Sequence, residues 1–262
     1  MNESSPRPPA NYFSSLRGWE TFFAAGTPVL TYHKIGPRPR GARLKGMYLP
    51  AALLKRQLGE FKISGYHCPS YDAVVNGASA EGKRCFITFD DGCVNVLDHA
   101  LPLLRESGAA AIQFLVAGLL GRRTEWQAGT GEILEPIMDA SQVREWLAAG
   151  QSIGAHTMTH PRLTTIAVDR AKEEIFASRK SLEDTFGIPI RHFCYPYGDL
   201  NERVVELVRE AGYETAATTD LGVNTAATDP HRLKRITARY PSRKFKNLPL
   251  LARLAWHRLV GG

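Results

Sequence analysis

The sequence predicts an α/β fold in which strands and helices alternate around a parallel sheet, open or closed into a barrel. From Pro28 onward, short apolar runs alternate with segments of helical periodicity. Several polar side chains follow directly after the apolar runs, and the carboxyl ends of parallel strands are where such folds gather catalytic groups. The length of 262 residues suits one large domain of this class.

The individual elements follow from the period of the apolar residues. The expected strands are 29–33, 85–89, 111–116, 152–156, 192–195 and 214–218. The expected helices are 50–64, 94–106, 139–149, 168–186 and 200–211. Asp199 is a suitable N-cap for the last helix, and Gly212 is a stop signal for it.

Three parts are expected along the chain: an N-terminal arm (1–27), a barrel domain (28–240) and a basic amphipathic C-terminal tail (241–262). The arm is polar and contains prolines, so we expect it to be poorly structured, although Trp19, Phe22 and Phe23 could dock part of it. The sequence shows no apolar signal-peptide segment and no apolar run of about 18 residues. It therefore predicts a cytoplasmic protein without a signal peptide.

The net charge of +7 is concentrated in 34–45 and 232–258. No nucleic-acid-binding motif accompanies this charge, so we expect no nucleic-acid partner. An anionic lipid or a phosphorylated substrate would fit, and a solubilising surface is the alternative. The tail resembles a basic amphipathic helix that could contact the inner face of the membrane, but packing onto the barrel is equally open.

Two short runs carry metal-binding chemistry. Residues 88–92 read Thr-Phe-Asp-Asp-Gly, and residues 156–160 read His-Thr-Met-Thr-His. Asp and His are ligands that divalent metals prefer, and one Asp with two His leaves positions open, as a catalytic metal site requires. The other Asp would be free to act as a base. The alternatives are a helix-capping loop for the Asp pair and ordinary buried polar residues for the His pair.

Together with Phe-Cys-Tyr-Pro-Tyr-Gly at 193–198, these runs resemble, in order and spacing, three motifs of the polysaccharide deacetylases, carbohydrate esterase family 4 with its NodB-homology domain. The likeness extends from about Val29 to about Ile236. It implies a distorted (β/α) barrel of the polysaccharide deacetylase type. It also implies metal-dependent removal of N-acetyl groups from amino sugars.

The resemblance implies a role for each motif residue. Asp91, His156 and His160 would bind the metal, Asp90 would be the general base, and Tyr197 would offer its backbone N–H to the oxyanion. Zinc is the expected metal, with Co²⁺, Ni²⁺ or Mn²⁺ as alternatives. A bound metal can lower the pKa of its water to about 7, and this activated water would attack the amide.

The expected proton donor departs from the common family pattern. Many members supply a His from a Leu-x-His motif near the C-terminus, but residues 233–236 here read Leu-Lys-Arg-Ile. Residues 30–33 read Leu-Thr-Tyr-His, which is similar to members with an N-terminal Tyr-His motif. We therefore predict His33 as the general acid, with His257 as a second candidate. A packing role for His33 at a strand end is the alternative.

Further departures concern the residues around the base and the substrate. Cys194 stands where the third motif often has an Arg that pairs with the base, and the Asp-Trp pair of the fourth motif is missing. Arg235 is predicted to replace the lost cation. Tyr195 and Tyr197 are expected to line a sugar cleft, because aromatic faces suit pyranose rings. Pro196 and Arg235 are predicted, with Tyr195, to contact the substrate.

These features predict a metal-dependent carbohydrate N-deacetylase, an amide C–N hydrolase of cell envelope biosynthesis. The expected substrate is an amino-sugar glycan or a lipid-linked saccharide intermediate. One alternative is hydrolysis of another amide on the same fold, such as deformylation or opening of a cyclic amide. The other is a non-catalytic sugar-binding protein, which would not need a free base beside a metal.

Overall fold

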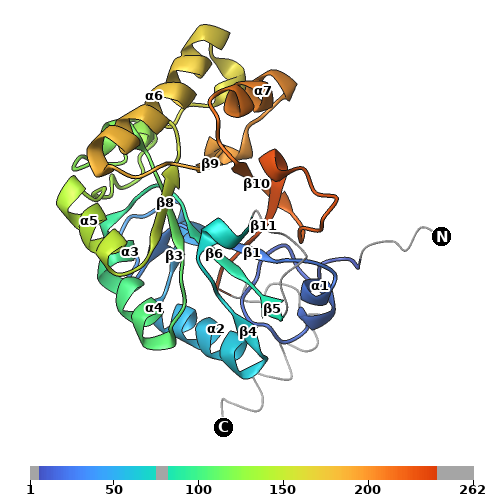
Figure 1. Ribbon diagram of the computed structural model, residues 1–262. Helices are drawn as coiled ribbons and strands as arrows, with labels where there is room; N and C mark the ends of the chain where they lie inside the picture. Colours follow the sequence, from blue (N-terminus) through green and yellow to red (C-terminus); the bar gives the residue numbers. More distant parts are fainter. Residues whose placement is uncertain (1–5, 75–81, 241–262) are drawn as a thin grey trace, which may run out of the picture.

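The computed structural model describes residues 6–74 and 82–240. Within these residues, parallel strands close into a barrel in the order β1-β11-β10-β9-β8-β7-β6, and helices surround it (Figure 1). The strands are β1 Val29–Tyr32, β6 Phe86–Phe89, β7 Ile112–Leu115, β8 Ser152–Ala155, β9 His192–Cys194, β10 Thr215–Leu221 and β11 Leu233–Thr237. The expected (β/α) barrel is confirmed.

The helices agree closely with the expected ones. They are α1 Glu20–Ala24, α2 Ala51–Ile63, α3 Val94–His99, α4 Leu101–Ser107, α5 Ala140–Ala148, α6 Val168–Phe186 and α7 Glu202–Glu210. The predicted helix 94–106 is divided into α3 and α4, with Pro102 in the first turn of α4. Proline has no N–H, and its ring collides with the carbonyl four residues earlier, so a continuous helix cannot form there.

The last barrel strand, β11, was not among the expected strands. Its centre is Lys234-Arg235, and two adjacent cations conceal the apolar alternation of a strand. In the barrel the two side chains face opposite ways, so Lys234 is exposed while Arg235 is 1% exposed. The barrel is least regular near this strand, where the pairing of β10 with β11 changes register between Ala217 and Leu221.

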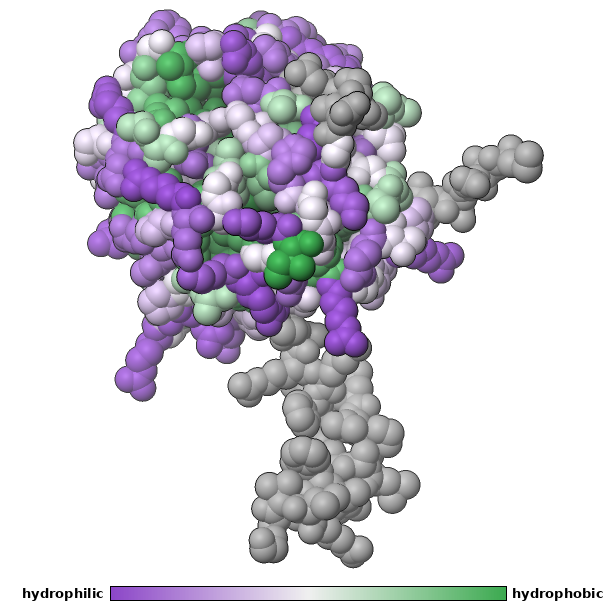
Figure 2. Space-filling view, turned by 60° about the horizontal axis from the view of Figure 1, so that its bottom comes forward, coloured by the Kyte–Doolittle hydropathy of each residue, from purple (hydrophilic) through white to green (hydrophobic). Residues whose placement is uncertain are grey.

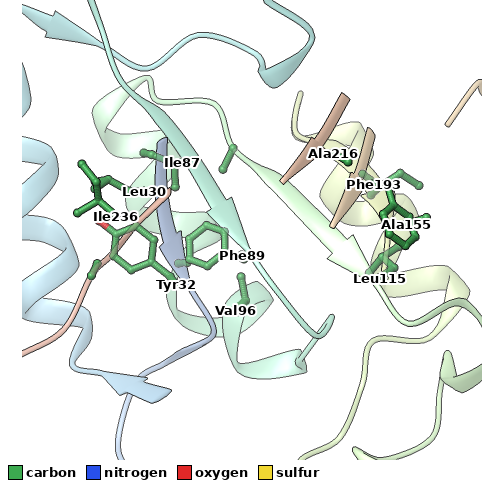
Figure 3. Packing of buried hydrophobic residues seen from close by; sticks show 14 of the residues in the cluster. Leu30, Tyr32, Ile87, Phe89, Val96, Leu115, Ala155, Phe193, Ala216 and Ile236 are labelled. Atoms are coloured by element: carbon green, nitrogen blue, oxygen red, sulfur yellow. The ribbon is translucent and has the colours of Figure 1, made fainter. Parts of the chain in front are cut away.

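Side-chain alternation decides which residues enter the barrel. Ile87 and Phe89 of β6 pack outward with Leu30 and Tyr32 of β1, beneath the surrounding helices (Figure 3). The residues between them therefore point inward, and the same alternation directs Asp90, directly after β6, into the barrel interior.

The amino-terminal end of the barrel is closed by aromatic packing. Tyr71, in a 3₁₀ turn at Tyr71–Val74, contacts Phe86, Phe114 and His192 edge to face, with ring centroids 5.8, 5.9 and 5.0 Å away. Gly154 of β8 lies against the same interior, where an added Cβ would be 2.7 Å from the Phe114 ring. This end is therefore packed solid, and the opposite end is left for chemistry.

The described part of the predicted N-terminal arm is integrated into the domain. Phe13 pairs with Ala238 beyond β11, and its N–H donates to the Thr237 carbonyl at 2.9 Å. Trp19 and Phe23 are 4% and 1% exposed and pack with Phe13 on α2. Docking of these aromatic side chains orders the segment, so the expectation of a poorly structured arm is wrong for this part.

The expected N-cap of the last long helix is also corrected. Asn201 caps α7, with its side-chain oxygen accepting the Val204 N–H at 2.9 Å. Asp199 instead accepts the backbone N–H and the hydroxyl of Thr164, both at 2.8 Å. Both residue types cap helices equally well, so tertiary contacts made the choice.

No helix in residues 6–74 and 82–240 is long and apolar enough to cross a bilayer. The face shown in Figure 2 carries many hydrophilic residues with smaller hydrophobic areas between them. The predicted amphipathic tail and His257 lie outside the described residues.

A pH-dependent contact at the closed end of the barrel gives a stability prediction. A hydrogen bond from His192 at 3.2 Å is the main cause that lowers the pKa of Asp72 to about 2, although burial opposes it. A carboxyl with a lowered pKa stabilises the fold above its unfolded pKa, near 4, and this stabilisation disappears as the pH falls toward 2.

We expect Asp72→Asn to lower the melting temperature at pH 6 and the difference from the wild type to shrink between about pH 4 and pH 3. Asp98→Asn, at an exposed position, is the control. A difference that stays constant across this pH range would contradict the prediction.

Candidate active site

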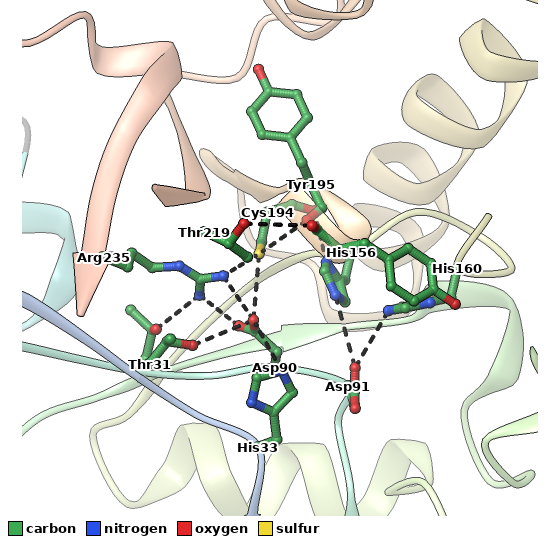
Figure 4. Close-up of polar contacts among 12 residues, drawn as sticks. Thr31, His33, Asp90, Asp91, His156, His160, Cys194, Tyr195, Thr219 and Arg235 are labelled. Carbon is green, nitrogen blue, oxygen red and sulfur yellow. Dashed lines mark hydrogen bonds and ion pairs between the residues drawn. The ribbon is translucent and has the colours of Figure 1, made fainter. Parts of the chain in front are cut away.

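Three potential metal ligands lie together at the carboxyl end of the barrel. Asp91 follows β6, and His156 and His160 follow β8 (Figure 4). The Asp91 Oδ1 atom lies 3.8 Å from His156 Nε2 and 3.5 Å from His160 Nε2. All three residues are buried, and their ligand atoms lie within 4.8 Å of one another. The structure thus brings together the triad predicted from the sequence.

Both imidazoles are prepared to act as ligands. His156 Nδ1 contacts the Cys194 carbonyl at 2.7 Å, and because a carbonyl only accepts, Nδ1 donates this hydrogen bond and Nε2, which faces Asp91, is the atom available to a metal. His160 stacks on Trp126 at 4.4 Å and meets Tyr197 edge to face at 4.7 Å. Burial, together with the nearby His156, lowers the pKa of His160 to about 3, so it is neutral at physiological pH.

Backbone strain is concentrated at this end of the barrel. Among the described residues, the non-glycine residues with positive φ are Asp91, Thr157, His160 and Tyr197, with φ between 61° and 79°. Such conformations typically cost about 1–3 kcal/mol each and persist where surrounding contacts enforce them. The Thr157 hydroxyl supplies one such contact by accepting the His160 N–H at 2.9 Å.

Asp90 points into the barrel and forms a bidentate ion pair with Arg235. The two guanidinium Nη atoms donate to its two oxygens, each at 2.8 Å. Arg235 also donates to the Thr88 hydroxyl, the Thr218 carbonyl and the Cys194 sulfur, at 3.0, 2.7 and 3.1 Å. All five N–H donors of this buried side chain therefore have acceptors. Arg235 occupies the cationic position that the sequence predicted for it.

The ion pair keeps Asp90 ionised. Burial alone raises the pKa of this carboxyl, but the charge and hydrogen bonds of Arg235 outweigh burial and hold the pKa well below its usual range. Asp90, His156 and Cys194 also lie within ligand distance of one another. Since Arg235 already binds both Asp90 oxygens, the second grouping does not suit a cation.

His33, directly after β1, reaches the same carboxylate. Its Nε2 lies 3.8 Å from Asp90 Oδ2, and 20% of its side chain is exposed. Burial lowers the pKa of His33, although Asp90 partly opposes this shift, so the imidazole is largely neutral at neutral pH. Of His33, Asp90 and Arg235, His33 is partly exposed and the other two are buried.

The predicted substrate contacts Tyr195, Pro196 and Arg235 need correction, because all three side chains are buried. Tyr195 is fully buried, and its hydroxyl donates to the His231 carbonyl at 3.0 Å, so its ring does not line an open cleft (Figure 4). Pro196 is buried in the 3₁₀ turn Pro196–Gly198. Tyr197 is 45% exposed, and the Arg162 guanidinium lies 4.2 Å from its ring centroid. The exposed aromatic ring is therefore that of Tyr197.

Trp126 contacts a candidate metal ligand, although no sequence motif marks it. It lies in the short 3₁₀ helix Glu125–Gln127, within the long connection from β7 to α5. The contact of Trp126 with His160 depends on how this connection folds back over the barrel. No local sequence pattern predicts that path.

The arrangement fits a divalent metal. One carboxylate and two imidazoles converge, and this mixed O/N set suits zinc and other borderline divalent cations. Asp91, His156 and His160 would hold the ion, while Asp90 is engaged by Arg235 and stays outside the ligand set.

Comparison with known proteins agrees with this geometry. The chain is 25% identical to YxkH of Bacillus subtilis, named as a polysaccharide deacetylase, over 81% of this chain and 71% of that protein. It is 30% identical to the chitooligosaccharide deacetylase of Azorhizobium caulinodans, over 48% of this chain and 54% of that protein. The chain thus spans about half the length of the latter.

Solved structures show the same fold. The deacetylase PplD of Streptococcus pyogenes, in complex with acetate, superimposes with a TM-score of 0.70 at 26% identity, covering 82% of this chain and 92% of that one. IcaB from Ammonifex degensii superimposes with a TM-score of 0.71 at 23% identity, covering 81% and 91%. The family model described as polysaccharide deacetylase matches residues 77–216, more than half of the chain. With its closed parallel barrel, this chain belongs to the polysaccharide deacetylase family.

Proposed function

We propose that this protein is a metal-dependent deacetylase that removes an N-acetyl group from an amino sugar in a glycan or a lipid-linked saccharide. The observation that carries this proposal is that two adjacent carboxylates have different partners. Asp91 converges with two imidazoles, whereas Asp90 is held ionised by Arg235 beside His33. A sugar-binding protein would need neither a separate base nor a proton donor. Zinc is the proposed metal, and when bound it would supply a Lewis acid for an otherwise unreactive amide.

The chain's own residues supply the proton transfers. Asp90 takes a proton from the attacking water and passes it to His33, 3.8 Å away. His33 then donates it to the departing nitrogen as the C–N bond breaks, which yields the free amine and acetic acid, and the acid ionises to acetate by releasing its proton to solvent. The lowered pKa of His33 fits this order, because the imidazole begins neutral and becomes an acid only after receiving the proton.

The rim of the site is proposed to bind the sugar. The backbone N–H of Tyr197 would stabilise the oxyanion. The partly exposed rings of Tyr197 and Trp126 flank His160 and offer apolar faces to a pyranose. We also propose that the protein acts in the cytoplasm and contacts the membrane through its C-terminal tail. This tail lies outside the described residues.

Acetate release tests the proposed function. We expect the purified protein to release acetate from N-acetylglucosamine oligomers or from a lipid-linked N-acetyl sugar, to lose this activity with a chelator, and to regain it with Zn²⁺ or Co²⁺. Release of formate from N-formyl sugars, without acetate, would instead favour deformylation. A protein that binds no metal and releases neither acid would support the non-catalytic alternative.

Matched variants separate the two carboxylates. Asp91→Asn should lose both bound metal and turnover, because it removes a ligand. Asp90→Asn should keep the metal but lower kcat by about 10²–10⁴-fold, since it removes the base. His67→Gln, at an exposed position, is the control.

An arginine on another strand should be able to take over the role of Arg235. Arg235→Ala should reduce kcat/KM by about 100-fold or more, because Asp90 loses the group that orients it. Adding Cys194→Arg to this variant should restore part of the activity, since the Cys194 sulfur lies 3.7 Å from Asp90 Oδ2. Unchanged turnover in Arg235→Ala would refute the role of Arg235.

His33 can be tested through the leaving group. An amine leaves only when protonated, whereas the phenolate of 4-nitrophenyl acetate leaves without a proton. His33→Gln should therefore lower amide hydrolysis by about 10²–10⁴-fold and affect the ester far less. His257→Gln should leave both reactions unchanged. Equal losses on both substrates would argue against His33 as the proton donor.

A further inference from the structure

A buried carboxylate from α6 contacts the turn that carries the second imidazole. Glu174 is 1% exposed and lies on the helix face that also buries Ala171 and Ile175. Glutamate is almost never buried to this extent unless it is paired and hydrogen-bonded. The burial of Glu174 therefore indicates a specific set of partners.

Those partners lie between His156 and His160. Glu174 Oε2 accepts the backbone N–H groups of Met158 and Thr159, at 2.9 and 2.8 Å. Glu174 Oε1 accepts the Thr159 hydroxyl at 2.6 Å and is paired with Arg170 at 2.7 Å. Hydrogen bonds to an ionised acceptor are roughly twice as strong as neutral ones. One carboxylate thus holds two successive amides and a hydroxyl of the same turn.

The turn needs such support because its backbone is strained at both ends. Thr157 and His160 have φ of 67° and 65°, in the left-handed region. Met158 and Thr159, the residues that Glu174 binds, lie between them. The carboxylate therefore enforces a backbone path that the sequence would not adopt alone, and this path sets the direction of the His160 ring.

We propose that Glu174 is a positioning residue that holds His160 in ligand geometry before a metal binds. This inference rests on the proposed function, since it assumes that His160 is a ligand. Glu174 acts through the turn and does not touch the metal or the substrate. Its removal should weaken metal affinity while leaving the chemistry largely intact once metal is saturating.

Zinc titration of the full chain tests the proposal. Residues that orient metal ligands typically contribute 10–100-fold to affinity, so Glu174→Ala should raise the Kd for Zn²⁺ by about that factor. Glu174→Gln should be intermediate, because its amide oxygen can still accept both backbone N–H groups but its NH₂ cannot accept from Thr159 or Arg170. Saturating Zn²⁺ should restore most of the kcat of both variants.

Glu173→Gln is the matched control. Glu173 lies on the same helix, is exposed, and pairs with the same Arg170 at 2.7 Å. It makes no hydrogen bond to the 157–160 turn within the part of the chain that the structure describes. The Glu173→Gln variant should bind zinc with the same affinity as the wild type.

A readout in the metal-free protein makes the test independent of activity. Without Glu174, the Met158 and Thr159 amides should exchange hydrogen faster, while the interior of α6 stays protected. If Glu174→Ala does not fold, Thr159→Val removes one of the same bonds from an exposed side chain and should give a smaller change in the same direction.

The outcomes separate the two proposals. A wild-type protein that binds no zinc would overturn the proposed metal site and, with it, the role of Glu174. Zinc binding by the wild type, with unchanged affinity and amide exchange in a folded Glu174 variant or in Thr159→Val, would overturn the role of Glu174 alone.

Discussion

The bidentate ion pair between Arg235 and Asp90 is the interaction on which the candidate site depends. It links β11 to the end of β6 across the barrel interior, and the remaining donors of Arg235 bind Thr88, Cys194 and Thr218 on β6, β9 and β10. A buried guanidinium is tolerated only when its charge and donors are satisfied. The position of the proposed base is therefore fixed by the closed barrel and not by its own loop.

This network also explains a departure from the family pattern. The cation expected from the third motif is absent at Cys194, and Arg235 on β11 takes its place beside Asp90. The Cys194 sulfur accepts a hydrogen bond from the guanidinium, while the Cys194 carbonyl contacts His156 Nδ1. The same charge arrangement is thus reached from a different strand. Arg235 reaches Asp90 from the middle of β11, and Cys194, at the end of β9, lies 3.7 Å from the same carboxylate.

The candidate site contains residues with a strained backbone and other residues whose hydrogen bonds stabilise that backbone. The proposed ligands Asp91 and His160 adopt left-handed backbone conformations. Thr157 and Glu174 accept hydrogen bonds from the turn that carries His160, which makes the conformation of that turn tolerable. Side chains held in this way have little freedom to lose when a ligand binds, which favours binding. The solid packing around Tyr71 at the other end confines the chemistry to one face of the barrel.

Much of this arrangement followed from local sequence. Strand–helix alternation predicted the barrel, and the short runs containing Asp90, Asp91, His156 and His160 placed polar groups after strands, where barrel closure brings them together. Side-chain alternation along a strand is a local property, so it predicts which residues point inward. Only the tertiary structure decided that β11 closes the barrel, that Tyr195 is buried, that Trp126 stacks on His160 and that Glu174 accepts hydrogen bonds from Met158 and Thr159. Each of these outcomes depends on contacts between residues far apart in the chain, which no periodicity or motif spacing encodes.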